Sequence, residues 1–178
     1  AHRHGVIHRD VKPQNILLAE LGETVVIDWG LAKVVGEEEE ENLDTHVPSA
    51  ADSLQTQIGS VFGTPGFMAP EQARGEALDT QGDVYALGAT LYQLLSGEPP
   101  VRGVSATEVM DKTRTHDIRP LAETAAGAPP DLVAIATKAL AFDPNNRYRD
   151  AGELGEDVRR FLDGRLVAAH DYTKRQKL

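Results

Sequence analysis

The sequence predicts a mainly α-helical fold with short pairs of β-strands at one edge and about five helices. Three observations support this prediction. Short β-branched runs stand near the start of the chain, apolar residues recur at helical spacing from residue 80 on, and Gly, Pro and Asp mark the ends of those segments. The chain has 178 residues, of which 40% are hydrophobic and 26% charged, a composition typical of one globular domain or one large lobe.

The first part of the chain is predicted to hold short strands around a polar loop. Residues 1–4 are typical of the last turn of a helix, and Gly5 stands where a helix commonly ends in a left-handed residue. Three short apolar runs are the predicted strands: 6–8, 16–18 and 24–27. The third strand places Asp28 at its end.

The segment from 36 to 58 is predicted to be a mobile acidic insert. It contains five consecutive glutamates, at 37–41, and its apolar residues follow no period. The formal net charge of the chain is −10. A nucleic-acid partner is therefore not expected, because binding phosphates requires clustered Lys and Arg.

Four longer helices are predicted in the second half of the chain: 80–96, 105–115, 131–142 and 150–164. Gly97 follows the first of them as a stop signal. Ser105 and Asp150 each precede a glutamate by three positions, which is the pattern of a capping box at a helix start. Residues 166–178 are predicted to be a C-terminal tail.

Composition also limits the setting of the protein. The absence of cysteine excludes a disulfide framework and thiol chemistry, and His2, His4 and His8 follow no common spacing of zinc ligands. No secretory signal is visible, and no uninterrupted apolar stretch approaches the roughly 20 residues of a spanning helix. We expect a cytoplasmic location without a membrane segment in this chain, either alone or as the cytoplasmic part of a membrane-anchored parent.

The polar loop between the first two predicted strands carries the most informative motif, His-Arg-Asp-Val-Lys-Pro-Gln-Asn at 8–15. Asp10 supplies a carboxylate, Lys12 an ammonium group and Asn15 an amide oxygen. These are the three groups needed to accept a hydroxyl proton, to neutralise a transferring phosphoryl group and to hold a magnesium ion.

Four further motifs follow along the chain: Asp-Trp-Gly at 28–30, Gly-Thr-Pro-Gly-Phe-Met-Ala-Pro-Glu at 63–71, Asp83, and Asp-Pro-Asn-Asn-Arg at 143–147. Asp83 stands inside a predicted apolar helix. A carboxylate in such a place is costly unless it is hydrogen-bonded, so donors are expected around it.

In this order and spacing, the five motifs resemble those of the bacterial eukaryotic-like (Hanks-type) serine/threonine protein kinases. Lys12 together with Thr64 resembles the Ser/Thr-directed branch of that family. The resemblance implies a protein-kinase-like α+β fold of which only the C-terminal lobe is present, at 1–165, with an activation segment at 28–71. It also implies transfer of the γ-phosphoryl group of ATP to Ser or Thr hydroxyls of protein substrates.

The resemblance assigns roles to residues of the catalytic site. Asp10 would orient the substrate hydroxyl and accept its proton, and Lys12 would contact ATP and neutralise the transferring group. Asn15 and Asp28 would hold Mg²⁺, with Mn²⁺ as the alternative ion, and would thereby help to bind ATP. Leu17 would form the floor of the ATP site.

Other residues of the same motifs are expected to support the site. Gly63 and Thr64 would dock the substrate peptide, with the Thr64 hydroxyl against the catalytic loop. Glu71 and Arg147 would form a buried ion pair. Asp83 would accept backbone N–H bonds from the catalytic loop.

His8, Arg9 and Trp29 are expected to have structural roles. Trp29 replaces the usual Phe of the family and should fill an apolar slot under the metal site. Arg9 is a cation beside the catalytic Asp, and we expect it to lack a partner until an anion arrives. That anion would be a phosphate on Thr56 or Ser60, the two candidate phosphorylation sites, or alternatively the neighbouring glutamates.

The N-terminal lobe is expected to be missing from this chain. The seven residues before the motif at 8–15 hold no Gly-rich loop, no strand Lys and no regulatory-helix Glu. Because positioning and electrostatics supply most of phosphoryl-transfer catalysis, we expect the isolated chain to be inactive and the longer parent to be the active enzyme. The alternative is a non-catalytic pseudokinase, scaffold or binding module.

Overall fold

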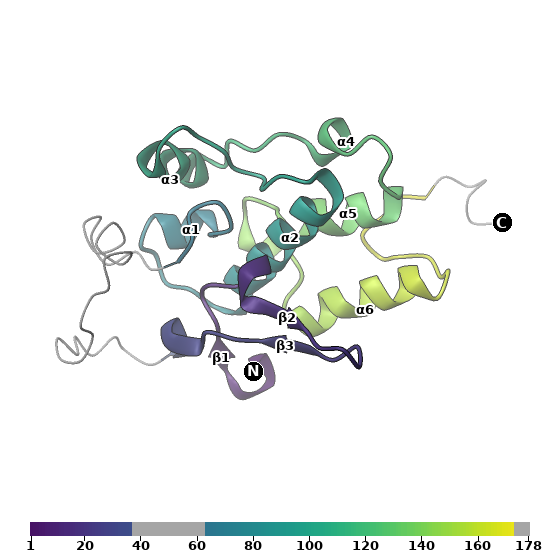
Figure 1. Cartoon of the computed structure of the whole chain (residues 1–178), viewed down its shortest axis with the longest axis horizontal. Coiled ribbons are helices and arrows are strands. Elements are labelled where there is room, and N and C mark those ends of the chain that lie inside the picture. Colours follow the sequence, from purple (N-terminus) through teal and green to yellow (C-terminus); the bar gives the residue numbers. More distant parts are fainter. Residues whose placement is uncertain (37–62, 173–178) are drawn as a thin grey trace.

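The computed structural model of the chain describes residues 1–36 and 63–172 (Figure 1). Within these ranges, two small antiparallel sheets come first and six α-helices follow, which confirms the mainly α-helical prediction. Two of the helices, α1 (Pro70–Ala73) and α4 (Leu121–Thr124), have four residues each and were not predicted. Apart from Gly36, the expected acidic insert lies outside the described residues.

Each sheet is one pair of strands. Strand β1 (Val6–Ile7) pairs with β4 (Lys33–Val34), and β2 (Ile16–Leu18) pairs with β3 (Thr24–Val26). The three predicted strands are present, although two of them end one residue earlier than expected. Strand β4 was not predicted, because two residues are too few to show a period. The polar loop at 8–15 connects β1 to β2.

The chain begins with η1 (His2–His4), a single 3₁₀ turn and not the α-helical end that was expected. Gly5 ends this turn at φ 70°, so the predicted left-handed stop is confirmed. The turn brings the first residues of the chain against the long central helix, where Nε2 of His2 lies 2.9 Å from Oδ2 of Asp83.

Helix α2 (Thr80–Ser96) lies at the centre of the molecule, next to α5 and α6 (Figure 1). Asp79 caps its start by accepting a hydrogen bond from the amide of Gln81 at 2.8 Å, and Gly97 ends it at φ 81°. The helix is buried on several sides, because it forms part of both main apolar clusters of the described residues. Its central position makes it the support to which the catalytic loop is attached.

The three other long helices are α3 (Ala106–Thr115), α5 (Pro130–Ala139) and α6 (Ala151–Leu162). Both predicted caps are confirmed: Ser105 accepts a hydrogen bond from the amide of Glu108 at 3.2 Å, and Asp150 accepts one from the amide of Glu153 at 3.0 Å. Helix α6 ends two residues before the predicted end, within the usual uncertainty of helix boundaries.

Helix α5 ends three residues before the predicted position at Phe142, and the reason is visible in the structure. Pro144 has no N–H to offer the Leu140 carbonyl, so the helical hydrogen bond between them cannot form. The Leu140 carbonyl instead accepts a hydrogen bond from Nε2 of His116 at 2.7 Å. The carbonyls of Ala141 and Phe142 accept hydrogen bonds from the guanidinium group of Arg147, at 2.7 and 3.1 Å.

The role of His116 predicts a pH dependence of stability. Burial lowers the pKa of His116 below its usual value near 6.5, with Arg147 adding repulsion. The unfolded chain then binds this proton more readily than the folded chain, so the free energy of unfolding should fall as the pH is lowered through about 6.5. His116→Asn, which tolerates the φ of 56° at this position, should make that fall shallower in urea titrations between pH 7 and 5. If the free energy of unfolding of His116→Asn fell with pH as steeply as that of the wild type, His116 would not be the cause of the pH dependence.

Part of the predicted C-terminal tail is attached to the helices. The amides of Ala168 and Ala169 donate hydrogen bonds to the Asp157 carboxylate at 2.8 and 3.0 Å, and the Tyr172 hydroxyl donates one to Asp131 at 2.8 Å. The tail up to residue 172 therefore packs against the helices. No helix in the described ranges is long and apolar enough to cross a membrane.

Candidate active site

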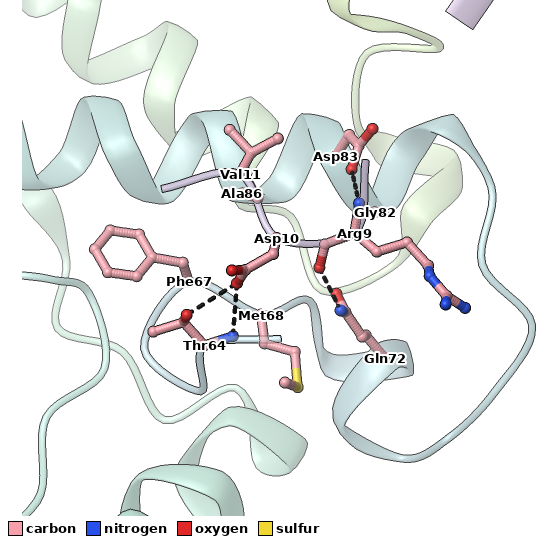
Figure 2. Close-up of a pocket in the computed structure, with 10 residues that line it drawn as sticks. All are labelled: Arg9, Asp10, Val11, Thr64, Phe67, Met68, Gln72, Gly82, Asp83 and Ala86. Atoms are coloured by element: carbon pink, nitrogen blue, oxygen red, sulfur yellow. Dashed lines mark hydrogen bonds between the residues drawn. The ribbon is translucent and has the colours of Figure 1, made fainter. Parts of the chain in front are cut away.

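The centre of the site is the carboxylate of Asp10, which is 7% exposed (Figure 2). Its Oδ1 accepts hydrogen bonds from both the amide and the hydroxyl of Thr64, each at 2.9 Å. Its Oδ2 accepts hydrogen bonds from Nζ of Lys12 at 2.6 Å and from Nδ2 of Asn15 at 3.2 Å. Lys12 also donates to the Thr64 hydroxyl at 2.7 Å. The structure thus brings together four residues that are up to 54 positions apart in the sequence.

This arrangement holds one hydroxyl group between an acid and a base. The Thr64 hydroxyl donates to Asp10 and accepts from Lys12, as expected from the sequence. A carboxylate in this position is able to accept the proton of a hydroxyl that attacks an electrophile. An ammonium group at the same distance is able to stabilise negative charge on the group that is attacked.

Asn15 and Asp28 lie at the same end of the β2–β3 pair. The amide of Ile27, the residue before Asp28, donates a hydrogen bond to the Asn15 carbonyl at 2.9 Å. The side chain of Asn15 is buried and donates through Nδ2 to the backbone carbonyl of Asp10 at 2.9 Å. Among the described residues, Oδ1 of Asn15, the atom that would ligate a metal, takes part in no hydrogen bond, and only Nδ2 does.

The donor set at this end fits a magnesium ion that arrives with phosphates. The described residues contain no group of three or more His, Cys, Asp or Glu side chains that could hold a metal ion by themselves. Mg²⁺ usually takes only one or two carboxylates from a protein and completes its coordination with water and substrate phosphates. One amide oxygen from Asn15 and one exposed carboxylate from Asp28 match that pattern.

Asp83 attaches the catalytic loop to α2. Its carboxylate is 4% exposed and accepts hydrogen bonds from the amides of His8 at 2.7 Å and of Arg9 at 2.9 Å. The expected backbone contacts of Asp83 are therefore confirmed. The carboxylate also lies in the first turn of α2, where the helix dipole favours negative charge.

The expectation that Arg9 lacks a partner in the absence of a phosphate is wrong. Its Nε donates a hydrogen bond to the backbone carbonyl of Leu31 at 2.6 Å. The backbone carbonyl of Arg9 accepts a hydrogen bond from Nε2 of Gln72 at 2.7 Å (Figure 2). Thr56 and Ser60, the candidate phosphorylation sites, lie outside the described residues.

Gly63 allows the segment at 63–71, in which Gly63 and Thr64 are expected to dock the substrate peptide, to approach the loop at 8–15. A Cβ atom at this position would lie 2.8 Å from Nε2 of Gln72 and 3.1 Å from the carbonyl of Arg9, and φ is 127°. Both constraints require glycine. Gln72 was not predicted as a site residue, and the only available signal was its place directly after the Ala-Pro-Glu motif.

Trp29 does not fill a buried slot, which corrects the expectation from the sequence. Its side chain is 45% exposed, and its Nε1 donates a hydrogen bond to the carbonyl of Val26 at 2.9 Å. The ring packs edge-on against His8, with 4.7 Å between ring centroids. His8 in turn is buried and contacts the carbonyl of Ile27 through Nε2 at 2.9 Å.

Glu71 and Arg147 form the buried ion pair that was predicted. Nη1 and Nη2 of Arg147 donate to the two carboxylate oxygens of Glu71 at 2.5 and 2.8 Å. The side chains are 0% exposed for Arg147 and 8% for Glu71. Arg147 also donates to the carbonyl of Gln81 at 3.0 Å and lies over the ring of Tyr85. The pair therefore joins the docking segment to the centre of the helical core.

Comparison with known proteins identifies the family of the chain. Residues 1–155 match the family model described as protein kinase domain. The chain is 38% identical over 169 residues to the serine/threonine-protein kinase PknB of Mycolicibacterium smegmatis, and 39% identical over 165 residues to PknB of Mycobacterium leprae. It is 37% identical over 169 residues to the serine/threonine-protein kinase PknD of Protochlamydia amoebophila.

These matches cover most of this chain and a small part of each relative. The match to PknB of Mycolicibacterium smegmatis includes 95% of this chain and 25% of the relative, and the match to PknB of Mycobacterium leprae includes 92% and 24%. The match to PknD includes 93% of this chain and 17% of the relative. The chain thus spans a quarter or less of these curated relatives. On the match of 155 residues and the identity to these proteins, the chain belongs to the protein kinase domain family, among the bacterial Hanks-type kinases.

Proposed function

We propose that residues 1–165 form the C-terminal lobe of a serine/threonine protein kinase domain, with an activation segment at 28–71 and a tail at 166–178. In the complete protein this lobe would serve the transfer of the γ-phosphoryl group of Mg·ATP to a Ser or Thr hydroxyl of a protein. The observation that carries the proposal is the single hydroxyl, that of Thr64, held between the Asp10 carboxylate and the Lys12 ammonium group.

In this proposal each residue of the loop has a separate task. Asp10 orients the incoming hydroxyl and accepts its proton, while Lys12 offsets negative charge on the transferred group. Asn15 and Asp28 hold magnesium, which when bound supplies Lewis-acid stabilisation of the phosphate oxygens. Thr64 keeps the carboxylate of Asp10 oriented until a substrate hydroxyl takes that place.

The nucleotide would lie against the β2–β3 pair. Leu17, the proposed floor of the ATP site, is 51% exposed. Three more apolar side chains of this strand pair and its turn are also exposed: Leu18 at 79%, Leu21 at 92% and Val25 at 48%. An exposed apolar group of this kind is typical of a surface that another part of a protein covers. It supports the proposal that an N-terminal lobe, not among these 178 residues, binds here.

The proposed partners are protein substrates and this N-terminal lobe, and nucleic acid is not among them. A cytoplasmic setting belongs to the proposal because ATP is the phosphoryl donor. A scaffold without catalysis is less well supported, because the loop keeps Asp10, Lys12 and Asn15 in mutual contact.

The proposal is tested by comparing the isolated chain with the complete protein that its gene encodes. Residues 1–178 alone should transfer no measurable phosphate from Mg·ATP to a generic basic protein, because the seven residues before the motif at 8–15 hold no Gly-rich loop and no strand Lys for the nucleotide phosphates. The complete protein should transfer it to Ser or Thr. Transfer by residues 1–178 that Asp10→Asn abolishes would contradict the half-domain proposal. A complete protein that binds ATP and transfers nothing would contradict the enzymatic one.

A further inference from the structure

We infer that Tyr148 is a positioning residue: its hydroxyl links the C-terminal segment 167–172, named the strap below, to Arg147 and thereby to the segment at 63–71. The role in substrate binding rests on the proposed function, whereas the structural link does not. The strap and its partner Asp157 lie beyond residue 155, where the match to the family model ends. Tyr148 was not predicted as a site residue.

Asp157, on α6, binds the strap and Tyr148 at the same time. It is 3% exposed, and its Oδ1 accepts a hydrogen bond from the amide of Ala168 at 2.8 Å. Its Oδ2 accepts hydrogen bonds from the amide of Ala169 at 3.0 Å and from the Tyr148 hydroxyl at 2.9 Å. Nε of Arg160 lies 4.0 Å from Oδ1. A buried carboxylate needs such donors in place of water, so each of the three hydrogen bonds supports the others.

The far end of the strap is attached to the start of α5, toward which the chain turns back after α6 (Figure 1). The Tyr172 hydroxyl donates a hydrogen bond to Oδ1 of Asp131 at 2.8 Å and accepts one from the amide of Val167 at 2.9 Å. Nδ1 of His170 contacts the same oxygen of Asp131. Val167 is 3% exposed and belongs to the same apolar cluster as Tyr148. The strap therefore completes the core on the side of Tyr148.

Tyr148 and Arg147 are neighbours whose side chains leave the backbone in opposite directions. Arg147 has an extended backbone, with φ of −83° and ψ of −179°, and successive side chains of an extended chain point to opposite sides. The guanidinium group of Arg147 binds Glu71 in the segment at 63–71, while the Tyr148 hydroxyl binds Asp157. Because the two residues share a peptide bond, a displacement of the Tyr148 ring displaces Arg147 as well.

The Tyr148 hydroxyl is the donor in its contact with Asp157. Tyr148 is 1% exposed, and Nζ of Lys138 lies 4.1 Å from its ring centroid. Burial, with the Asp157 carboxylate as the second cause, raises the pKa of Tyr148 above its usual value of about 10. The hydroxyl therefore keeps its proton at neutral pH, and Tyr148→Phe removes this one hydrogen bond while it leaves the ring in place.

Three Tyr→Phe substitutions separate this link from general stability. Tyr148→Phe breaks the contact with Asp157, and Tyr172→Phe releases the far end of the strap without touching Tyr148. Tyr92→Phe is the matched control. Tyr92 is 2% exposed and its hydroxyl is hydrogen-bonded to Oγ1 of Thr124 at 2.9 Å, but it belongs to the other main apolar cluster.

The first measurement is hydrogen exchange of the Arg147 Nε–H group by NMR in the 178-residue chain, which requires no activity. Its rate is divided by that of the slowest amides of α2, because those amides report global unfolding. Tyr148→Phe should raise this ratio about fivefold or more, and Tyr172→Phe about threefold or more, as expected for the loss of one hydrogen bond. Tyr92→Phe should leave the ratio nearly unchanged.

Two outcomes of this measurement would overturn the inference, whether or not the complete protein is a kinase. An equal ratio in Tyr148→Phe and Tyr92→Phe would show that Tyr148 does not hold Arg147. A raised ratio in Tyr148→Phe with an unchanged ratio in Tyr172→Phe would show that the strap has no part in the link. If Tyr148→Phe did not fold, the comparison of Tyr172→Phe with Tyr92→Phe would decide by the same criterion.

The second measurement is the kinetics of the complete protein. A looser Arg147 should weaken binding of the protein substrate at the segment 63–71, while the contacts of Asp10 remain. Tyr148→Phe should therefore raise the KM for the protein substrate about fivefold, with kcat and the KM for ATP within about twofold of wild type. A lower kcat with an unchanged KM, in this variant and in Tyr92→Phe alike, would show that Tyr148 is merely structural. If wild type itself transfers no phosphate, the proposed function fails, and hydrogen exchange still decides the link.

Discussion

Asp10→Asn is expected to lower the kcat of the complete protein for phosphorylation of Ser or Thr by about 10²–10⁴-fold, the usual contribution of a positioned general base. Asn is nearly the same size as Asp, so the fold should survive. Its amide group cannot accept a proton from the attacking hydroxyl. It would also turn an N–H₂ group toward donors from Lys12, Asn15 or Thr64, which all donate to the carboxylate in the native site.

The control for this prediction is Asp111→Asn, in α3. This side chain is 64% exposed, and its carboxylate forms an ion pair with Arg114 at 3.0 Å. A surface pair of this kind contributes about 0–1 kcal/mol, so kcat should stay within about twofold of wild type. Both variants should be compared by circular dichroism to confirm that they are folded. If Asp10→Asn retained more than about a tenth of the wild-type kcat, Asp10 would not be the base.

Arg147→Ala is expected to lower the free energy of unfolding by about 3–5 kcal/mol, because it leaves Glu71 as a buried charge without its partner. Together with the ion pair, Arg147→Ala removes the contact with the Tyr85 ring and three hydrogen bonds to backbone carbonyls, those of Ala141, Phe142 and Gln81. For a chain of this size, the melting temperature should fall by roughly 6–20 °C. Thermal unfolding of the 178-residue chain measures this directly.

Arg149→Ala is the matched control, two positions away. The side chain of Arg149 is 83% exposed, and within the described part of the chain it forms one ion pair, with Asp150 at 3.4 Å. Its loss should change the free energy of unfolding by less than about 1 kcal/mol. Glu71→Gln combined with Arg147→Met removes both charges and should be less destabilising than Arg147→Ala alone. Equal effects of Arg147→Ala and Arg149→Ala would contradict the assignment of the buried pair.

Local features of this protein could be predicted from the sequence because their causes lie within a few residues. The side chains of Ser105 and Asp150 each cap a helix by accepting a hydrogen bond from the backbone amide three residues later. Gly5 ends a 3₁₀ turn and Gly97 ends α2, because glycine readily adopts the left-handed backbone conformation that such an end requires. The positions of Asp10, Lys12 and Asn15 were also predictable, since one short loop carries all three.

Contacts that depend on packing between distant segments were predicted only where a known motif pointed to both partners. Asp83 with the loop, and Glu71 with Arg147, were found in this way. His2 and Gln72 belong to no such motif and were missed, although they contact the loop or its support at 2.9 and 2.7 Å.

What the sequence by itself determined is the identity and order of the longer helices and of three strands, and the chemical groups of the loop at 8–15, because period, caps and motif spacing are properties of neighbouring residues. The tertiary structure decided which partner each buried polar group found. It gave Arg9 the carbonyl of Leu31, and it gave the Leu140 carbonyl, which Pro144 leaves without a helical donor, the imidazole of His116. The physical reason is that a buried polar group must be paired, and the nearest partner is set by how the helices pack and not by the adjacent sequence.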